Sequence, residues 1–346
     1  MVSYKCPNCG GPLNYDIETQ KWACRFCLGS FDLSALKGHE DLPEASGVSS
    51  GGFGGAEAVQ EFVCPSCGGA IVSDQQTVAT YCVYCKNPTI LAGRLQDGER
   101  PEWILPFRIT KEGVTEILEK AMKNRPLMPK VFRETLGEGE VNGLYVPYWL
   151  YDLHLESQIT GQGKRVSSWQ DQKYRYTKTD VFHVERGGAV RYRHVPADAS
   201  KRLDDRSMQN IEPFDEQAMV DFDMRYLSGH FAERYDIKAE EAFPAVYQRV
   251  TEAWEQEMIR DTTYSSFQIR SRNHRYRERQ NHYAMMPVWI FSVKYRDKLY
   301  RFLVNGQTGK LTGKLPVDGR KLGIWLVGSF LGAWGLLSLL LSLFSM

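Results

Sequence analysis

All eight cysteines of this 346-residue chain fall in CxxC pairs, and the pairs form two matching sets near the N-terminus. "CPNCGGPLNYD" is followed by "CRFC", and "CPSCGGAIVSD" is followed at the same spacing by "CVYC". Four thiolates can close tetrahedrally on one Zn²⁺ at roughly 2.3 Å each, and two residues between cysteines turn both sulfurs towards the same ion. The predicted ligands of two Zn²⁺ ions are Cys6, Cys9, Cys24 and Cys27 for the first, and Cys64, Cys67, Cys82 and Cys85 for the second.

Each set predicts a small β-rich zinc ribbon, over residues 1–35 and 62–93. Units of about 30 residues bury too little surface to fold alone, so the metal must hold them together. Sulfur fills all four positions, which is typical of a structural site with no place for an activated water. Redox chemistry is the alternative, and the matched copies disfavour it. Residues 36–61, with "SGVSSGGFGG", predict a flexible Gly/Ser-rich linker.

The C-terminal segment from Leu322 to Phe344 contains no charged side chain. As a helix it would be roughly 34 Å long, enough for a bilayer core of about 30 Å. Basic residues precede it, which favours a cytoplasmic head. The segment therefore predicts a single-pass, tail-anchored protein of the cell membrane, in contact with the lipid bilayer and with its N-terminal domains in the cytoplasm.

Three glycines of that segment, Gly328, Gly332 and Gly335, fall on one stripe of a helix. Small residues at this spacing let two membrane helices approach closely, which predicts a membrane protein partner. The alternative is that these are scattered glycines of the kind that membrane helices tolerate.

Residues 101–316 predict an α+β domain, because helical periodicity alternates with aromatic strands. The expected helices are Lys111–Asn124 and Ala239–Ile259. One hairpin is expected to turn at the Gly187-Gly188 pair, and another near residues 296–298. The predicted fold class is thus two tandem zinc ribbons, an α+β domain and a single transmembrane helix.

An internal duplication of this domain is suggested by two similar segments, "VPYWLYDL" (Val146–Leu153) and "MPVWIFSV" (Met286–Val293). Each follows a helix and leads toward a turn that contains Gly and Gln. The alternative is that strands often begin with proline and an aromatic residue.

Nothing in the sequence argues for catalysis. "NGQTGKL" and "TGQGKR" lack the spacing of a phosphate loop, and the seven histidines show no ligand spacing. Basic and acidic residues nearly cancel, at 43 and 42, so no global field attracts nucleic acid. We therefore expect no enzyme activity.

One basic segment stands out, because its arginines are interleaved with aromatic residues that could bind RNA, DNA or anionic lipid. A solvated edge strand is the competing interpretation. The arginines are Arg270, Arg272, Arg275, Arg277 and Arg279.

On "CPNCGGPL…CRFC", "CPSCGGA…CVYC", "WILPFRITKE", "GLYVPYWLYD" and the apolar C-terminus, the chain resembles bacterial zinc-ribbon membrane proteins of the YdjG type. Such proteins are often described as helicase-like or TFIIB-like from the ribbons alone. The resemblance covers essentially the whole chain. It implies a membrane-bound scaffold that works with a neighbouring membrane protein to recruit flotillin-like (SPFH) and PspA-like envelope-stress proteins.

Three hypotheses about function follow from the sequence. The favoured one is a non-enzymatic, membrane-tethered zinc-ribbon adaptor that recruits SPFH-like and PspA-like proteins. The second is nucleic-acid binding by the ribbons and the Arg270–Arg279 strand, although the ribbons carry few basic residues. The third is an enzyme with an unrecognised site in the α+β domain.

Overall fold

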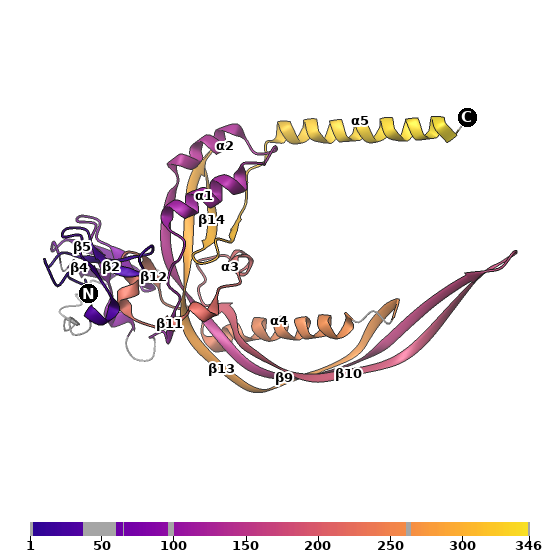
Figure 1. The fold of residues 1–346 in the computed structure, drawn as a ribbon, viewed down its shortest axis with the longest axis horizontal. Coiled ribbons are helices and arrows are strands. Elements are labelled where there is room, and N and C mark those ends of the chain that lie inside the picture. Colours follow the sequence, from indigo (N-terminus) through magenta and orange to yellow (C-terminus); the bar gives the residue numbers. More distant parts are fainter. Residues whose placement is uncertain (1–2, 37–59, 65, 96–99, 261–263, 345–346) are drawn as a thin grey trace.

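The elongated molecule has its cysteine-bearing segments at one end and the tip of a long β-arm at the other (Figure 1). Residues 37–59 of the predicted linker lie outside the residues that this computed structural model describes. The described residues are 3–36, 60–64, 66–95, 100–260 and 264–344, with side chains of the last helix as far as residue 335.

The first cysteine-bearing segment forms a three-stranded antiparallel sheet of β1 (Leu13–Asp16), β2 (Lys21–Cys24) and β3 (Ser30–Phe31). The short 3₁₀ helix η1 (Leu33–Leu36) follows it. Its core is small, because beside two cysteines it contains few apolar side chains. Those buried side chains are Leu13, Tyr15, Trp22 and Leu36.

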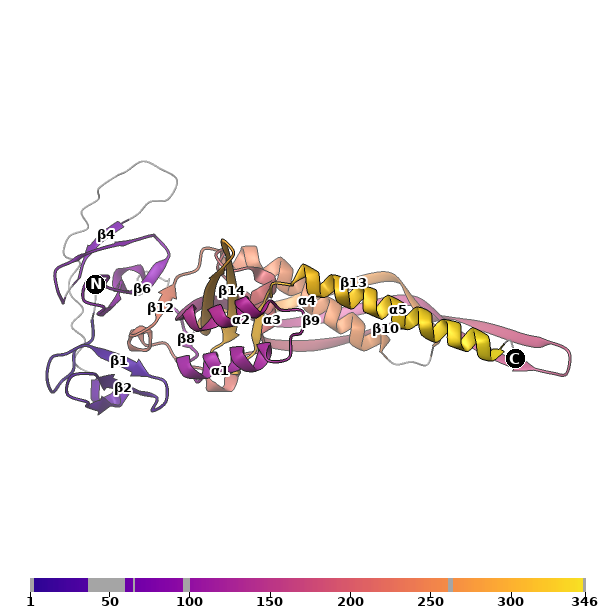
Figure 2. The same ribbon diagram turned by 90° about the horizontal axis from the view of Figure 1, so that it is seen from above.

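The second cysteine-bearing segment is divided between two sheets. β4 (Gln60–Val63) and β5 (Ala70–Ser73) form a separate two-stranded sheet. β6 (Thr77–Tyr81) and β7 (Pro88–Ile90) pair with each other and join the main sheet through β12 (Phe231–Glu233). β6 and β7 are therefore strands of the main sheet, and β6 lies next to β12 (Figure 2).

Three very long strands dominate the main sheet: β9 (Glu140–Gln170), β10 (Arg175–Asp198) and β13 (Ser266–Tyr295). β9 is antiparallel to both others, and together they build the curved arm (Figure 1). The short strands of the sheet are β6, β7 and β12 with β8 (Trp103–Ile104), β11 (Val220–Asp221), β14 (Lys298–Asn305) and β15 (Leu311–Gly313).

The helices α1 to α4 pack on the two faces of this sheet. The α-helices are α1 (Lys111–Met122), α2 (Lys130–Thr135), α3 (Asp205–Ile211), α4 (Ala239–Ile259) and α5 (Gly319–Phe344). The other 3₁₀ helices are η2 (Ala92–Leu95), η3 (Leu136–Glu138), η4 (Glu216–Ala218) and η5 (Met224–Leu227).

Alternation along β9 decides which helix covers which face, because successive strand residues point to opposite sides. Tyr151, Leu153 and Leu155 belong to the core that includes α1, α2 and α4. Leu144 and Tyr148 belong to the core that includes α3. Both faces of the sheet are therefore buried along residues 144–155 of β9.

The predicted α+β domain is corrected by this arrangement. The described chain consists mainly of β-structure, with one ten-stranded sheet as its body and the helices as its cover. The two helices predicted in this domain are confirmed: α4 has the expected bounds, and α1 begins where expected, with Thr110 as N-cap. The sequence did not predict α2 or α3. The sequence pattern failed for the strands, because helix-plus-hairpin units predict strands far shorter than those of the arm.

The hairpin expected at Gly187-Gly188 is also wrong, since β10 runs straight through these glycines and Gly187 pairs with Gln158 of β9. The chain turns instead between Gln170 and Arg175, where the Asp171 carboxylate accepts the amide N–H of Lys173 at 2.8 Å. The second predicted hairpin is confirmed: Arg296 and Asp297, both with positive φ, connect β13 to β14.

The C-terminal helix α5 begins on the α1–α2 connection. The Asp318 amide donates to the Leu127 carbonyl at 2.8 Å, and the Lys321 ammonium donates to the Met128 carbonyl at 2.8 Å. From there α5 projects away from the sheet (Figure 1). Its described apolar side chains are exposed, as at Ile324 and Trp325.

The predicted membrane span is corrected here. Within the part of the chain that the structure describes, no helix combines the length and the apolar character needed to cross a membrane. The prediction rested on the uncharged run from Leu322 to Phe344, a sequence pattern that does not by itself place a helix in a membrane. The transmembrane tail anchor, the single-pass membrane localisation with a cytoplasmic head, and the expected bilayer contact are corrected with it.

Candidate metal centres

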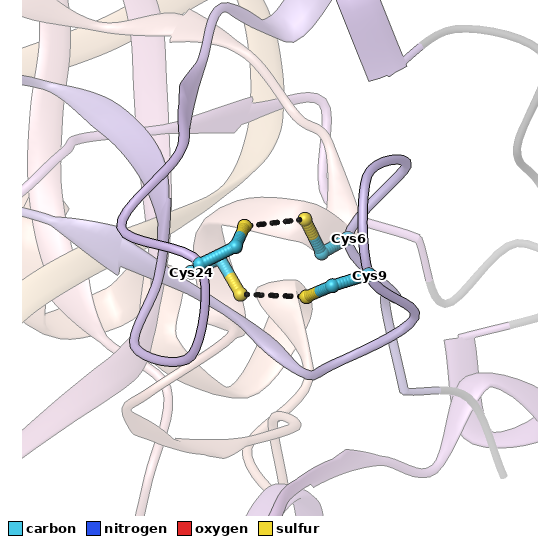
Figure 3. Close-up of side chains that lie close together, drawn as sticks. Cys6, Cys9 and Cys24 are labelled. Atoms are coloured by element: carbon cyan, nitrogen blue, oxygen red, sulfur yellow. Dashed lines mark hydrogen bonds between the residues drawn. The ribbon is translucent and has the colours of Figure 1, made fainter.

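The first four-cysteine group comes together as its spacing predicts. The Sγ atoms of Cys6, Cys9, Cys24 and Cys27 all lie within 4.8 Å of one another. Cys6 and Cys27 are 3.5 Å apart at sulfur, as are Cys9 and Cys24 (Figure 3). Tetrahedral Zn–S bonds of about 2.3 Å would place sulfurs about 3.8 Å apart. The group can therefore hold one metal ion.

The second group repeats this geometry. Cys64, Cys67, Cys82 and Cys85 also lie within 4.8 Å of one another at sulfur. The Cys64–Cys85 and Cys67–Cys82 pairs are 3.8 and 3.7 Å apart, close to the tetrahedral spacing. In both groups the first cysteine of each CxxC pair is buried and the second is exposed. Each group can thus hold one ion near the surface.

Tight turns aim the sulfurs at one point. The Gly10 amide donates to the Cys6 carbonyl and the Gly68 amide to the Cys64 carbonyl, both at 2.9 Å. Both glycines have φ of 72°, a conformation that glycine adopts without strain. The repeated glycine after each first pair is therefore explained by the backbone of the turn.

Backbone amides favour the thiolate form of one cysteine in each group, the first cysteine of the second CxxC pair. The backbone N–H groups of Cys27 and Phe26 lower the pKa of the Cys24 thiol to about 6. Burial raises the pKa of Cys82, but the equivalent two amides outweigh it and bring the pKa to about 7. These two sulfurs are ready to bind a cation near neutral pH.

Neighbouring sulfurs act in the opposite direction at other positions. The Gly29 amide acts to lower the pKa of Cys27, yet contact with the Cys6 sulfur and burial raise it to about 12. Cys67 behaves in the same way, with its pKa raised to about 12. Four thiols in one site cannot all ionise unless a cation balances their charge, so the donor set fits a dication.

The cysteine spacing did not reveal the role of the aromatic residue that stands between the two cysteines of the second pair in each group. Phe26 is 74% exposed and Tyr84 is 69% exposed. A Cβ added at Gly11 would lie 2.8 Å from the Phe26 ring, and one at Gly69 would lie 2.5 Å from the Tyr84 ring. The second glycine of each "CGG" therefore makes room for an aromatic ring, which we call the knuckle aromatic of that group.

The first ribbon is docked firmly on the body of the protein. Trp22 Nε1 donates to the Arg225 carbonyl at 3.0 Å, and the Tyr15 amide donates to the Ser228 carbonyl at 3.0 Å. The rings of Tyr15 and Trp22 both contact that of Tyr226, with centroids 5.0 and 5.1 Å apart. These contacts involve residues about 200 positions apart, so no local pattern could predict them.

The predicted arginine strand is β13, and its arginines contact carboxylates on neighbouring elements. Arg272 Nε lies 2.8 Å from Glu255 of α4, and Arg277 Nε lies 2.7 Å from Glu156 of β9. Arg279 lies over the Phe243 ring of α4 at 4.6 Å. Pairing of this kind weighs against a free phosphate-binding surface, and it fastens α4 to the arm.

The two remaining arginines of the strand differ from these. Arg270 donates to the Gln162 side chain at 3.4 Å, and Arg275 lines a shallow hollow beside Gly187 and Gly188.

The glycines predicted for membrane packing are Gly328, Gly332 and Gly335. They lie on α5, and an added Cβ at each would meet no described atom within 4 Å. The membrane partner expected for them is corrected together with the membrane span.

Comparison with known proteins places the chain in a family. It is 31% identical over 330 residues to a Bacillus subtilis (strain 168) protein with the name "Uncharacterized protein YdjG", over 95% of this chain and 94% of that protein. No family model matches the chain, and no solved structure matches it. The match agrees with the resemblance noted from the sequence. The chain belongs to the YdjG family.

Proposed function

We propose that this protein is a non-enzymatic scaffold that binds protein partners through its two four-cysteine groups, each held together by one zinc ion. Zinc is the ion that four thiolates in tetrahedral array favour, and an all-sulfur site is closed and structural. The observation that carries the proposal is the matched pair of exposed knuckle aromatics, Phe26 and Tyr84. Large aromatic side chains held rigidly at a surface are typical anchors of protein interfaces.

Further exposed apolar residues surround both knuckle aromatics. Leu28 is 85% exposed in the first group, and Val83 is 64% exposed in the second. Val63 and Val72, on β4 and β5, add two more exposed side chains beside the second group. Because a metal-held turn loses little entropy on binding, such residues can contribute more affinity than those of a mobile loop.

Nucleic-acid binding is the competing function. The exposed aromatics could stack on bases, but that mode needs a groove of positive charge. The first ribbon offers few cations, and its Lys21 is paired with Asp32 at 3.2 Å. Three arginines of β13 are occupied as described above. Recruitment of SPFH-like and PspA-like proteins, the TFIIB-like relationship and the lack of catalysis stay predictions.

The test is crosslinking in cells, followed by purification of the tagged full-length protein and identification of what is bound. We expect defined protein partners with the wild type and at least a tenfold loss of them with the Phe26→Ser/Tyr84→Ser double variant. The control is Leu299→Ser on β14, which removes an apolar side chain that is 56% exposed and lies outside both cysteine groups. We expect this variant to bind the same partners as the wild type. Recovery that is unchanged in the double variant would contradict the proposal, and nuclease-sensitive recovery would favour the nucleic-acid alternative.

A further inference from the structure

A cavity of about 860 Å³ lies beside α1 and α2, on the part of the molecule from which α5 projects (Figure 1). Its lining comes from α1, from the segment of α2 and η3, and from β9 and β13. It shares no residue with either cysteine group and forms no part of the proposed function. Its volume falls in the range of about 300–1,000 Å³ that is typical of small-molecule sites.

The floor of this cavity is apolar. Leu118 and Met122 come from α1, Val141 comes from β9 and Phe291 comes from β13. All four side chains belong to the main core, so the cavity opens directly onto buried hydrocarbon. Leu136 of η3 adds a partly buried apolar side chain to the lining. An alkyl chain placed here would leave water together with the surface that it covers, which is favourable.

The rim of the cavity carries more positive than negative charge. Its cations are Lys111, Lys120, Lys123 and Arg133, and its carboxylates are Glu116 and Glu119. Each glutamate precedes a lysine of α1 by four residues, a spacing at which opposite charges stabilise each other. The other two cations, Lys111 and Arg133, have no further carboxylate in the lining to balance them.

Arg133 is the cation best placed to hold an anionic group. Its Nη2 donates to the Met122 carbonyl at 3.3 Å, which places the guanidinium at the end of α1 beside the apolar floor. Among the residues that the structure describes, no carboxylate forms an ion pair with it. A guanidinium has five N–H donors in a planar fork that fits a carboxylate, so four remain for a ligand.

The combination of charge and apolar surface selects the class of ligand. A small anion would leave the apolar floor uncovered, and a neutral hydrocarbon would leave the Arg133 charge without a partner. The α1 wall extends from Lys111 to Lys123, roughly 18 Å at 1.5 Å per residue, which suits an extended chain. We propose that this cavity binds a single-chain fatty acid, with its carboxylate on Arg133 and its alkyl chain on the apolar floor.

Nuclear magnetic resonance of the full-length protein, labelled at its methionine methyl groups, tests this proposal by titration with laurate below its critical micelle concentration. We expect the Met122 methyl resonance, assigned with Met122→Leu, to shift saturably. Met208, buried against α3, is the internal control and should not shift. This local signal separates the cavity from the exposed apolar side chains of α5, which would attract laurate as well.

The variant Arg133→Gln removes the proposed anchor of the carboxylate and should weaken laurate binding at least tenfold. Arg125→Gln is the matched control, because Arg125 Nε also donates to a carbonyl near the end of α1, that of Ala121 at 3.2 Å, but does not line the cavity. Both variants therefore lose one such hydrogen bond. Arg125→Gln should bind laurate like the wild type.

Two other ligands test the carboxylate and the alkyl chain separately. Hexanoate keeps the carboxylate but shortens the chain, and it should bind at least tenfold more weakly than laurate. Dodecyltrimethylammonium keeps the chain but reverses the charge, and it should leave the Met122 resonance unchanged. A Met122 resonance that laurate does not shift would overturn the site. Equal binding of laurate by the wild type and Arg133→Gln, or equal binding of the cationic amphiphile, would overturn the assignment of an anionic ligand.

Discussion

At the scale of single residues, His230 is the least expected feature of the core. Both of its ring nitrogens are buried without a hydrogen-bond partner among the described residues. Its ring stacks on Phe107 at 4.4 Å, and a Cβ added at Gly143 would lie 2.6 Å from its Nδ1. Burial lowers the pKa of His230 from 6.5 to about 3, so the ring is neutral in the folded protein.

This burial predicts loss of stability in mild acid. The unfolded chain binds a proton at His230 near pH 6.5, whereas the folded chain does so only near pH 3. The stabilisation is therefore complete above pH 6.5 and is lost progressively as the pH falls below it, by about 2 kcal/mol between pH 6.5 and 5. Urea unfolding at both pH values should show this loss in the wild type and a clearly smaller one in His230→Leu. An equal loss in both proteins would show that His230 is not its source.

At the scale of elements, the arm depends on glycine where three strands meet. Gly161 of β9 is paired on one side with Val184 of β10 and on the other with Ile269 of β13. A Cβ at this position would lie 2.6 Å from the backbone carbonyl oxygen of Gln268. A backbone atom inside a sheet cannot move away as a flexible side chain can.

We therefore expect Gly161→Ala to destabilise the arm by about 1–3 kcal/mol. Hydrogen exchange of the β13 amides opposite Gly161 would measure this as faster exchange. Gly188→Ala on β10 is the control, because nothing lies within 4 Å of an added Cβ there. If both variants exchange alike, steric crowding at Gly161 is not what limits this position.

The sequence predicts elements well where the information is local. The CxxC spacing predicts the two cysteine groups because each CxxC pair forms a tight turn. Helical periodicity predicts the first and last residues of α4 correctly. The arm could not be predicted, because its pairing joins positions up to about 150 residues apart and its Gly187-Gly188 pair imitates a turn. The role of Arg272 was equally hidden, since its partner Glu255 belongs to a different element.

At the scale of the whole molecule, the two similar segments suspected of duplication meet at equivalent positions. Val146 of β9 is the register partner of Met286 of β13, and the two antiparallel strands run in opposite directions from this pair. α4 contacts the β9–β10 half, while Phe132 of α2 contacts Tyr295 and Phe302 in the β13–β14 half. This is the arrangement that a two-fold duplication would require, and the duplication itself stays a prediction.

The two cysteine groups differ in how they join this body. The first holds a separate three-stranded sheet, whereas β6 and β7 of the second are strands of the main sheet. Metal removal should therefore affect the two segments differently. Contacts of Tyr15 and Trp22 dock the first segment on the body, but we expect these contacts and the small core beside Cys6 and Cys24 to be too few to keep β1–β3 folded without the metal. Neighbouring strands hold β6 and β7 in place.

The most direct test of the account is hydrogen exchange over the whole chain, before and after metal removal, on protein whose zinc content has been counted by native mass spectrometry. We predict two zinc ions per chain. Their removal should abolish protection in β1–β3 and β4–β5 and leave it unchanged in β6, β7, β9 and β13. Amide protection that persists in β1–β3 after metal removal would contradict the claim that zinc holds the two four-cysteine groups together. A protein isolated with no zinc would contradict it as well.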